Sequence, residues 1–478
     1  MTGSQRGGRR QGPPRSGHSR PERTVQPARK AAYDVLRAVS ASDAYANLML
    51  PAVIAEAGLD PQDAALATEL TYGTLRRRGT YDAIIAAAAD RPASDIDPAV
   101  LDALRLGAHQ LLATRVAPHA AVNESVNLVA AAQGRGASSF ANAVLRRISR
   151  EGAERWQEII ESGARSDDER LALRTAHPVW VIRALRRALA AEERAAELDA
   201  LLDADNVSPE VTLVALPGLA EPGDPRRPYA ATAFASPGGD PHRIVAGSGG
   251  RIRVQDEGSQ LVALALAAAA PIRAGERWLD LCAGPGGKTA LLAAIAHESG
   301  VTLEANEVVP ARAGLVRNAL RPVPGEVVVH EQDGREFASG RPGAFDRILV
   351  DAPCTGLGAL RRRPEARWRK SPADVAELVP LQTQLLSAAL DALAPGGIVA
   401  YVTCSPHLAE TTGVVQEVLR ERPEYVELDA ARVVAGLARN PIDLAEGSGH
   451  VQLWPHRHRT DAMFLALIQR PASDSQGD

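Results

Sequence analysis

Residues 280–289 read Asp-Leu-Cys-Ala-Gly-Pro-Gly-Gly-Lys-Thr and stand between an apolar run, 277–281, and a helical stretch, 289–297. Glycines here let the backbone approach a ligand closely, and the helix that follows presents unpaired N–H groups and a positive dipole end. A phosphate or the carboxylate of a methionine moiety would suit this loop. A P-loop ATPase is the alternative, but Gly-x-x-x-x-Gly-Lys-Ser/Thr requires glycine where Cys282 stands, so the match fails by one residue.

Outward from this loop, strands and helices alternate over residues 251–472. The strand-length apolar runs are 277–281, 301–305, 326–330, 347–350 and 398–403, and the helical stretches between them are 289–297, 311–320 and 379–393. Such alternation predicts an α/β, Rossmann-like fold, in which a parallel sheet carries helices on both faces and binds ligands at the carboxyl ends of its strands. A late run, 463–468, predicts an antiparallel strand at one edge.

The first part of the chain has a different pattern. Apolar residues recur at helical spacing from 27 to 152, as in Ala31, Val35, Leu36 and Val39, which predicts an all-α domain. Residues 153–250 continue as helices, then a strand at 211–216, then a Gly- and Pro-rich stretch that we expect to be a linker and small irregular subdomain. Residues 1–26 are expected to be a disordered basic tail, and 473–478 a short tail.

The net charge and the cysteine count limit the possible partners, sites and location of the protein. The net charge is -4 over 478 residues, which does not by itself indicate nucleic acid. Basic clusters at 76–78, 146–150 and 361–370 could neutralise phosphates or could be solvated helix faces. The three cysteines are widely spaced with no Cys-x-x-Cys pair, so we expect neither a disulfide framework nor a metal site. Without a signal peptide or a bilayer-length apolar run, the expected location is the cytoplasm, away from membranes.

Two cysteines lie in segments that begin directly after a predicted strand. Asp351-Ala352-Pro353-Cys354 follows 348–350, and Thr403-Cys404-Ser405-Pro406 follows 399–402. A lone cysteine there is more often a small buried apolar residue, but two at adjacent strand ends favour a reactive site. A thiolate that attacks carbon 6 of cytosine makes carbon 5 able to accept a methyl group, which is covalent catalysis by a low-pKa thiol. Asp351 is well placed to protonate the ring nitrogen.

Acids also follow two other strands. Glu307, after Asn306, stands about 20 residues past the glycines, where an acid commonly accepts hydrogen bonds from ribose hydroxyls. Asp333 could contact an adenine, although Asp333-Gly334 could also be a simple turn.

At these residues the chain closely resembles the bacterial ribosomal RNA cytosine-C5 methyltransferases, the RsmB (Sun/Fmu) branch of the NOL/NOP/Sun family. The resemblance runs through 254–260, 282–288, 351–354, 361–364 with Arg367 and Trp368, 403–405, and 453–455 before Asp461. The helical region 27–152 is similar to the NusB-like RNA-binding module of this branch, through 70–76 and 140–146.

The resemblance implies S-adenosylmethionine-dependent methylation of carbon 5 of a cytosine, with small-subunit (16S) ribosomal RNA as the expected substrate and a monomer as the expected state. It makes Cys404 the nucleophile and Cys354 the residue that helps release product, an assignment that spacing alone cannot make. The implied cofactor contacts are Cys282, Ala283, Gly284, Pro285, Gly286, Gly287, Lys288, Glu307, Asp333 and Asp351. The expected RNA contacts are Arg361, Arg362, Arg363, Arg367 and Trp368.

The role of Trp368, the non-catalytic class of protein and the choice of target are the remaining questions. Trp368 could stack on a base or be a buried anchor of its loop. A non-catalytic NusB-type RNA-binding protein would have lost residues such as Lys288 and Cys404, and neither is lost. Residues 206–250 match the family poorly, which leaves target selection open.

Overall fold

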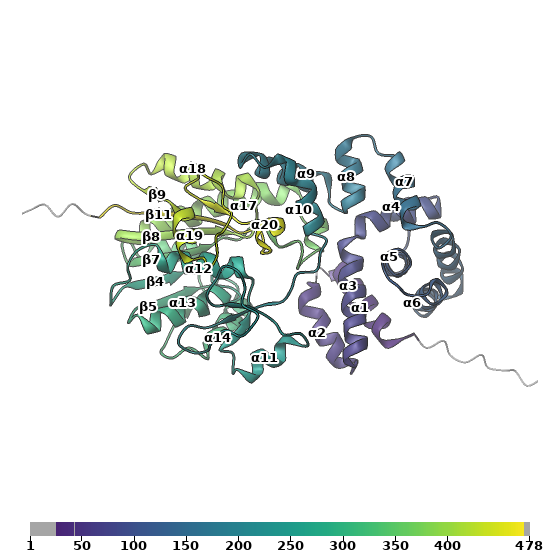
Figure 1. The fold of residues 1–478 in the computed structure, drawn as a ribbon, viewed down its shortest axis with the longest axis horizontal. Helices are drawn as coiled ribbons and strands as arrows, with labels where there is room; N and C mark the ends of the chain where they lie inside the picture. Colours follow the sequence, from purple (N-terminus) through teal and green to yellow (C-terminus); the bar gives the residue numbers. More distant parts are fainter. Residues whose placement is uncertain (1–24, 43, 473–478) are drawn as a thin grey trace, which may run out of the picture.

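The computed structural model describes residues 25–42 and 44–472, so most of the predicted basic tail and the short C-terminal tail lie outside the described residues. The N-terminal region is a helical bundle, at the right of Figure 1. Asp97 caps the central helix, α5 (Pro98–Ala113), and almost every residue of its first three turns is buried. Around it pack α1 (Pro27–Ser42), α3 (Pro61–Arg76), α4 (Arg78–Ala89) and α6 (Pro118–Ile148), with α2 (Ala46–Glu56) against α1.

Linker helices join the bundle to the rest of the chain. They are α7 (Ala153–Ser162), α8 (Asp167–Thr175), α9 (Val179–Ala191) and α10 (Leu198–Ala204). Apolar residues of α9 and α10, such as Leu185 and Leu201, share a buried cluster with Leu357, Leu360 and Trp454 of the C-terminal half. The linker therefore covers part of the region that follows Cys354.

The predicted strand at 211–216 is present, and it is the centre of a small antiparallel sheet whose second strand lies in the stretch expected to be irregular. Its strands, in the order β2-β1-β3, are β1 (Thr212–Ala215), β2 (Ala233–Ala235) and β3 (Ile252–Val254), and α11 (Pro241–Gly247) lies beside it. Leu213 and Phe234 form its buried apolar face. β3 lies in the range expected for the Rossmann-like fold, yet it pairs with β1.

The C-terminal part is the predicted Rossmann-like fold. Its mixed sheet has the order β10-β11-β8-β7-β4-β5-β6, with β9 also pairing with β11. The parallel strands are β4 (Arg277–Asp280), β5 (Thr302–Asn306), β6 (Val328–His330), β7 (Phe345–Asp351) and β8 (Leu393–Thr403). The antiparallel strands are β9 (Val426–Leu428), β10 (Val451–Gln452) and β11 (Phe464–Gln469).

Helices cover both faces of this sheet, each over its own apolar cluster. One face carries α12 (Glu257–Ala268), α13 (Gly287–Glu298), α14 (Pro310–Leu320) and α19 (Ala430–Leu437). The other carries α15 (Gly334–Ser339), α17 (Pro372–Ala392) and α18 (Thr412–Glu421), while the short α16 (Ala366–Arg369) and α20 (Pro455–His458) lie in connecting segments.

Two expectations about strand order can now be compared with the sheet. β7 and β8 are parallel neighbours, as the placement of the two thiols at one rim required. β11 is antiparallel as predicted, but the expectation of an edge position was wrong, because β9 and β10 pair with its other side. Among the described residues, no helix is long and apolar enough to cross a membrane, and no group of His, Cys, Asp or Glu side chains could hold a metal ion.

Arg367 joins the bundle, the linker and the C-terminal half. Its side chain is fully buried, and it donates hydrogen bonds to the Arg76, Ala176 and Asp205 carbonyls and to Asn206 Oδ1. Burial lowers the pKa of Arg367 to about 10, which still leaves it charged at neutral pH. The expectation that Arg367 contacts RNA is therefore wrong in this structure, because protein carbonyls occupy its guanidinium.

Trp368 packs beside Gly79 at the start of α4, where a side chain on residue 79 would collide with the indole ring. Its ring Nε1 is buried with no hydrogen-bond partner among the described residues. The buried-anchor alternative is thus the one that the structure supports.

Arg367→Ala is expected to lower the free energy of unfolding by about 3 kcal/mol, because buried acceptors lose their charged donor. Denaturant unfolding followed by tryptophan fluorescence measures the change. Arg155→Ala is the control, because Arg155 is an exposed partner of Glu158 and should change stability by less than about 0.5 kcal/mol. Equal midpoints for the two variants would contradict this role of Arg367.

Candidate functional site

The glycine loop connects β4 to α13 through Cys282, Ala283, Gly284, Pro285, Gly286, Gly287 and Lys288. Gly286 has a φ of +103°, and a Cβ there would lie 2.7 Å from the Ala319 Cβ. A Cβ on Gly284 would collide with the Glu307 carboxylate. Glycine is therefore required at position 286, and a side chain at position 284 would displace the Glu307 carboxylate. The loop forms a cradle of bare backbone at the N-terminus of α13. A cradle of this kind fits the carboxylate end of a methionine-derived cofactor.

Glu307 and Asn306 lie at the end of β5 and connect this loop to its neighbours. The buried Glu307 carboxylate accepts hydrogen bonds from Gly284 N and Val309 N, both at 3.0 Å. Asn306 donates to the carbonyls of Leu281 and Gln332 and so joins the segments after β4 and β6. The loops that follow three adjacent strands are thereby held together.

Asp333 follows β6 and caps α15, where it also pairs with Arg335 at 2.5 Å. This pairing lowers the pKa of Asp333 to about 2. Because the strand order is β7-β4-β5-β6, the predicted cofactor residues follow consecutive strands along one rim of the sheet.

The two thiols meet at this rim. Cys354 lies three residues past β7, Cys404 directly follows β8, and their Sγ atoms are 3.5 Å apart. The hydrogen bond from Cys354 lowers the pKa of Cys404, and the positive charges of Lys288 and Arg363 also lower it, against burial and Asp351. The same hydrogen bond, together with burial, raises the pKa of Cys354 well above the usual thiol value. The pair is therefore asymmetric, with Cys404 as the more readily ionised thiol.

Lys288 links the glycine loop to the thiols. Its Nζ lies 2.8 Å from Asp351 Oδ2. Burial alone would lower the pKa of Lys288, but the charge and hydrogen bond of Asp351 outweigh it and raise the pKa. The site thus contains a charged ammonium–carboxylate pair beside an ionisable thiol.

Glu410 is a buried acid that the sequence reasoning missed. Its carboxylate accepts hydrogen bonds from Thr355 N at 2.7 Å, Thr355 Oγ1 at 2.5 Å and Ser405 Oγ at 2.6 Å. Gln382 of α17 donates to Glu410 at 3.2 Å and to the Pro353 carbonyl at 2.8 Å. Thr355 follows Cys354 and Ser405 follows Cys404, so this one carboxylate holds both cysteine loops. In the sequence, Leu408-Ala409-Glu410 carries no sign of burial, because only the pairing of β7 with β8 encloses it.

The predicted RNA residues that remain differ in exposure. Arg361 is buried near Asp461, and Arg362 forms an ion pair with the same carboxylate. Arg363 is exposed. The expectation that Arg361 contacts RNA is therefore wrong in this structure, because its side chain is buried beside Asp461, whereas Arg363 faces solvent.

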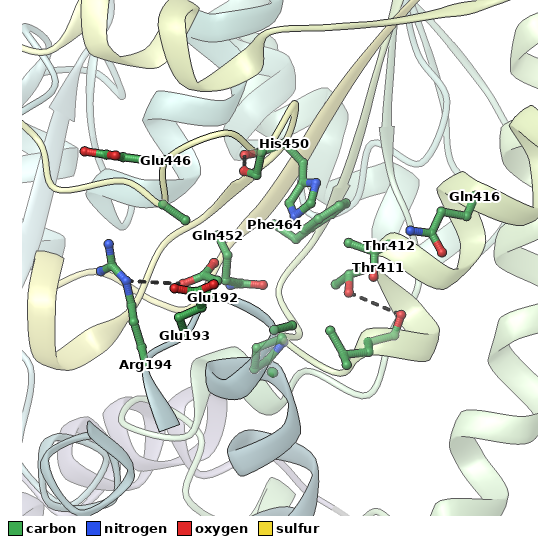
Figure 2. Close-up of a pocket in the computed structure, with 16 residues that line it drawn as sticks. Glu192, Glu193, Arg194, Thr411, Thr412, Gln416, Glu446, His450, Gln452 and Phe464 are labelled. Carbon is green, nitrogen blue, oxygen red and sulfur yellow. Dashed lines mark hydrogen bonds and ion pairs between the residues drawn. The ribbon is translucent and has the colours of Figure 1, made fainter. Parts of the chain in front are cut away.

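A cavity of ≈ 500 Å³, shown in Figure 2, is lined in part by Pro406, two residues past Cys404. Glu192 and Arg194 at the end of α9, His450 and the start of α18 line it, with Pro406 from the cysteine loop. None of the predicted catalytic or cofactor residues within the described chain lines this cavity. The candidate catalytic site is therefore identified from the positions of its side chains, and this cavity is not part of it.

Two family profiles match parts of this chain. Residues 267–469 match the sequence profile of a family described as 16S rRNA methyltransferase RsmB/F, and residues 26–150 match the NusB family. The Ribosomal RNA small subunit methyltransferase B of Pseudomonas putida is 34% identical over 445 residues, covering 88% of this chain and 96% of its own. A Mycobacterium tuberculosis protein whose name places it among the methyltransferases is 49% identical over 460 residues, covering 94% and 97%.

Among solved structures, that of PH0851 is similar in fold, with a TM-score of 0.76 and 21% identity over 93% of this chain and 99% of its own. The names of the relatives give no support to the P-loop ATPase alternative.

The thiol asymmetry predicts selective alkylation. A lowered pKa means that Cys404 is thiolate from a lower pH than an ordinary cysteine, whereas Cys354 stays protonated. Iodoacetamide labelling followed by peptide mass spectrometry, across a pH series, should therefore modify Cys404 first. In Cys354→Ala the lost hydrogen bond should shift the Cys404 curve to higher pH. A curve that does not move, or one that moves lower, would contradict the pairing.

Glu410→Ala should lower kcat for methyl transfer to ribosomal RNA by about tenfold to hundredfold, because small displacements of reacting groups have effects of this size. Affinity for S-adenosylhomocysteine, measured by calorimetry, should stay within about twofold. Glu410→Gln keeps one acceptor oxygen and should recover part of the rate. The control is Glu417→Ala on the exposed face of α18. A matched loss of rate and cofactor affinity would point to general unfolding instead of a positioning role.

Proposed function

The chain belongs to the 16S rRNA methyltransferase RsmB/F family, and we propose that it methylates carbon 5 of a cytosine in small-subunit ribosomal RNA through a covalent bond to Cys404. As a family member it is an S-adenosylmethionine-dependent ribosomal RNA methyltransferase with an N-terminal NusB-type domain. The observation that carries the finer proposal is the 3.5 Å contact between Cys354 and Cys404 beside the Lys288–Asp351 pair.

The cofactor would lie along the rim formed by the glycine loop, Glu307, Asp333 and Asp351. The backbone cradle at Gly284 and Gly286 supports this placement, because a side chain at position 286 would clash with α14 and one at position 284 would displace Glu307. When bound, S-adenosylmethionine supplies an electrophilic methyl group on a sulfonium. The chain's own residues must activate the cytosine and then release it.

In the proposed reaction, the Cys404 thiolate forms a bond from Sγ to carbon 6 of the cytosine. The electron pair displaced from the ring double bond reaches the N3 side of the ring, where the Lys288–Asp351 pair supplies a proton. Carbon 5 is then enamine-like and accepts the methyl group. The hydrogen-bonded, lowered-pKa thiol supports Cys404 in the attacking role.

Release requires the proton on carbon 5 to leave. Once Cys404 is bonded to carbon it carries no negative charge, so the interaction that raised the pKa of Cys354 is lost. Cys354 can then give its proton to water and accept the carbon-5 proton. The ring double bond re-forms, the Sγ–carbon 6 pair returns to Cys404, and N3 returns its proton to Lys288–Asp351. The net products are 5-methylcytosine, S-adenosylhomocysteine and one proton, and both thiols return to their starting roles.

Covalent trapping tests this proposal. Wild type, Cys404→Ala and Cys354→Ala are each incubated with S-adenosylmethionine and small-subunit ribosomal RNA and run on a denaturing gel. Cys354→Ala should accumulate a protein–RNA adduct, because it attacks but cannot release, and Cys404→Ala should form none. Nucleoside analysis of the wild-type product should yield 5-methylcytidine. Adduct from Cys404→Ala alone would reverse the two roles, and a different methylated nucleoside would overturn the proposed reaction.

A further inference from the structure

Two basic clusters that lie far apart in the sequence form one surface. Arg367 donates a hydrogen bond at 3.1 Å to the carbonyl of Arg76, 291 positions away, and Trp368 packs beside Gly79. The segment 361–370 therefore lies against the corner between α3 and α4, which carries Arg77 and Arg78. Figure 1 shows this junction where the bundle adjoins the C-terminal half, near α2 and α3.

Tyr45, just before α2, adds an aromatic ring to this surface. The residue is 45% exposed, although large apolar side chains are usually more buried. The guanidinium carbons of Arg363 and Arg369 lie 5.6 Å and 5.4 Å from the ring centroid, within cation–π distance. The ring comes from the bundle and both cations come from the C-terminal half.

Hydrogen bonds on either side of the ring hold this group in place. Arg369 donates to the carbonyls of Val39 and Ala44, and Glu365 accepts from the backbone N–H of Ala46. Because these bonds already join the two parts of the chain, the exposed ring and the exposed Arg363 are not needed to hold the junction.

The group also lies close to the thiols. Gly358 N donates to the carbonyl of Cys404 at 2.8 Å, and Arg363 is five residues further along the chain, which is at most about 18 Å. After Cys354 and Lys288, Arg363 is among the groups that lower the pKa of Cys404. A strand of RNA whose cytosine reaches Cys404 would therefore pass this surface within a few nucleotides.

We propose that Tyr45 and Arg363 form a second RNA subsite, in which an unpaired base flanking the target cytosine stacks on the exposed ring and Arg363 contacts its phosphates, while Arg369 holds the ring in place. This proposal rests on the proposed function, because it takes the RNA strand to run through the cysteine site. Unpaired bases are recognised by stacking on aromatic rings and guanidinium planes, and phosphates by arginine, so an exposed ring beside the exposed Arg363 suits single-stranded RNA. The NusB-type domain would then complete the catalytic face as well as recruit the substrate.

The test compares Tyr45→Ala, Tyr45→Phe and Arg363→Ala with wild type, using naked 16S ribosomal RNA in filter binding and methyl-transfer kinetics. Tyr45→Ala should raise KM for RNA and Kd about five- to hundredfold, the range found for losing one stacked base. Tyr45→Phe keeps the ring and should behave as wild type. Arg363→Ala should reduce the slope of log affinity against log salt by about one. The charge control is Arg420→Ala on α18, where Arg420 pairs with Glu417.

Photo-crosslinking locates the contact directly. Ribosomal RNA that carries 4-thiouridine should crosslink to the peptide containing Tyr45 in wild type, and much less in Tyr45→Ala. Unchanged affinity, KM and crosslinks in Tyr45→Ala would overturn the subsite. An effect confined to assembled small subunits, with naked RNA unaffected, would also overturn it, because the partner would then be a protein.

Two further measurements keep this result separate from the proposed function. Cys404 adduct formation and 5-methylcytidine in wild type test the reaction alone, whatever Tyr45 does. Melting temperatures check the folding of each variant, and if Tyr45→Ala does not fold, Arg363→Ala with its salt slope and crosslinks carries the test.

Discussion

The parallel pairing of β7 with β8 is the constraint on which the rest of the site depends. In this register Asp351 lies opposite Val402, so the segments that leave the two strands start side by side. Their cysteines then come within 3.5 Å, and the hydrogen bond between them makes one thiol easier to ionise than the other. The adjacent β4 brings the glycine loop and Lys288 to the same rim. A one-residue slip in this pairing would turn every side chain of the shifted strand to the opposite face and separate the thiols.

Local sequence patterns predicted the helices and strands of the sheet well. They predicted less well how the strands pair and which side chains become buried. The apolar runs and glycine loop placed β4, β5, β7, β8 and α13 because strand and helix periodicity is a property of short segments. The position of β11 inside the sheet could not be read this way, because β9 and β10 are short and their pairing is a tertiary event. The burial of Glu410 is of the same kind, since its donors come from residues 355, 382 and 405.

The basic segment 361–370 shows how charge misleads when burial is unknown. A run of arginines next to a predicted RNA-modifying site indicates phosphate contact. In the fold, Arg362 pairs with Asp461 and Arg367 bonds to protein carbonyls, and Arg363 faces solvent. The buried guanidinium of Arg367 is stable here because both of its terminal nitrogens donate to acceptors, which no composition argument can foresee. The segment connects two domains and the catalytic rim at once.

The hydrogen bonds around Glu410 have a consequence for how this sequence can diverge. One carboxylate serves donors from α17, the β7 loop and the β8 loop, so a change at any of these positions leaves partners of the others unsatisfied. The costs of such changes are not additive, because groups in one buried network couple to each other. A lineage that replaced Thr355 or Ser405 alone would be selected against, whereas a joint exchange could be neutral. Residues 355, 382, 405 and 410 should therefore covary as a group among relatives, even though no two of them are neighbours in the chain.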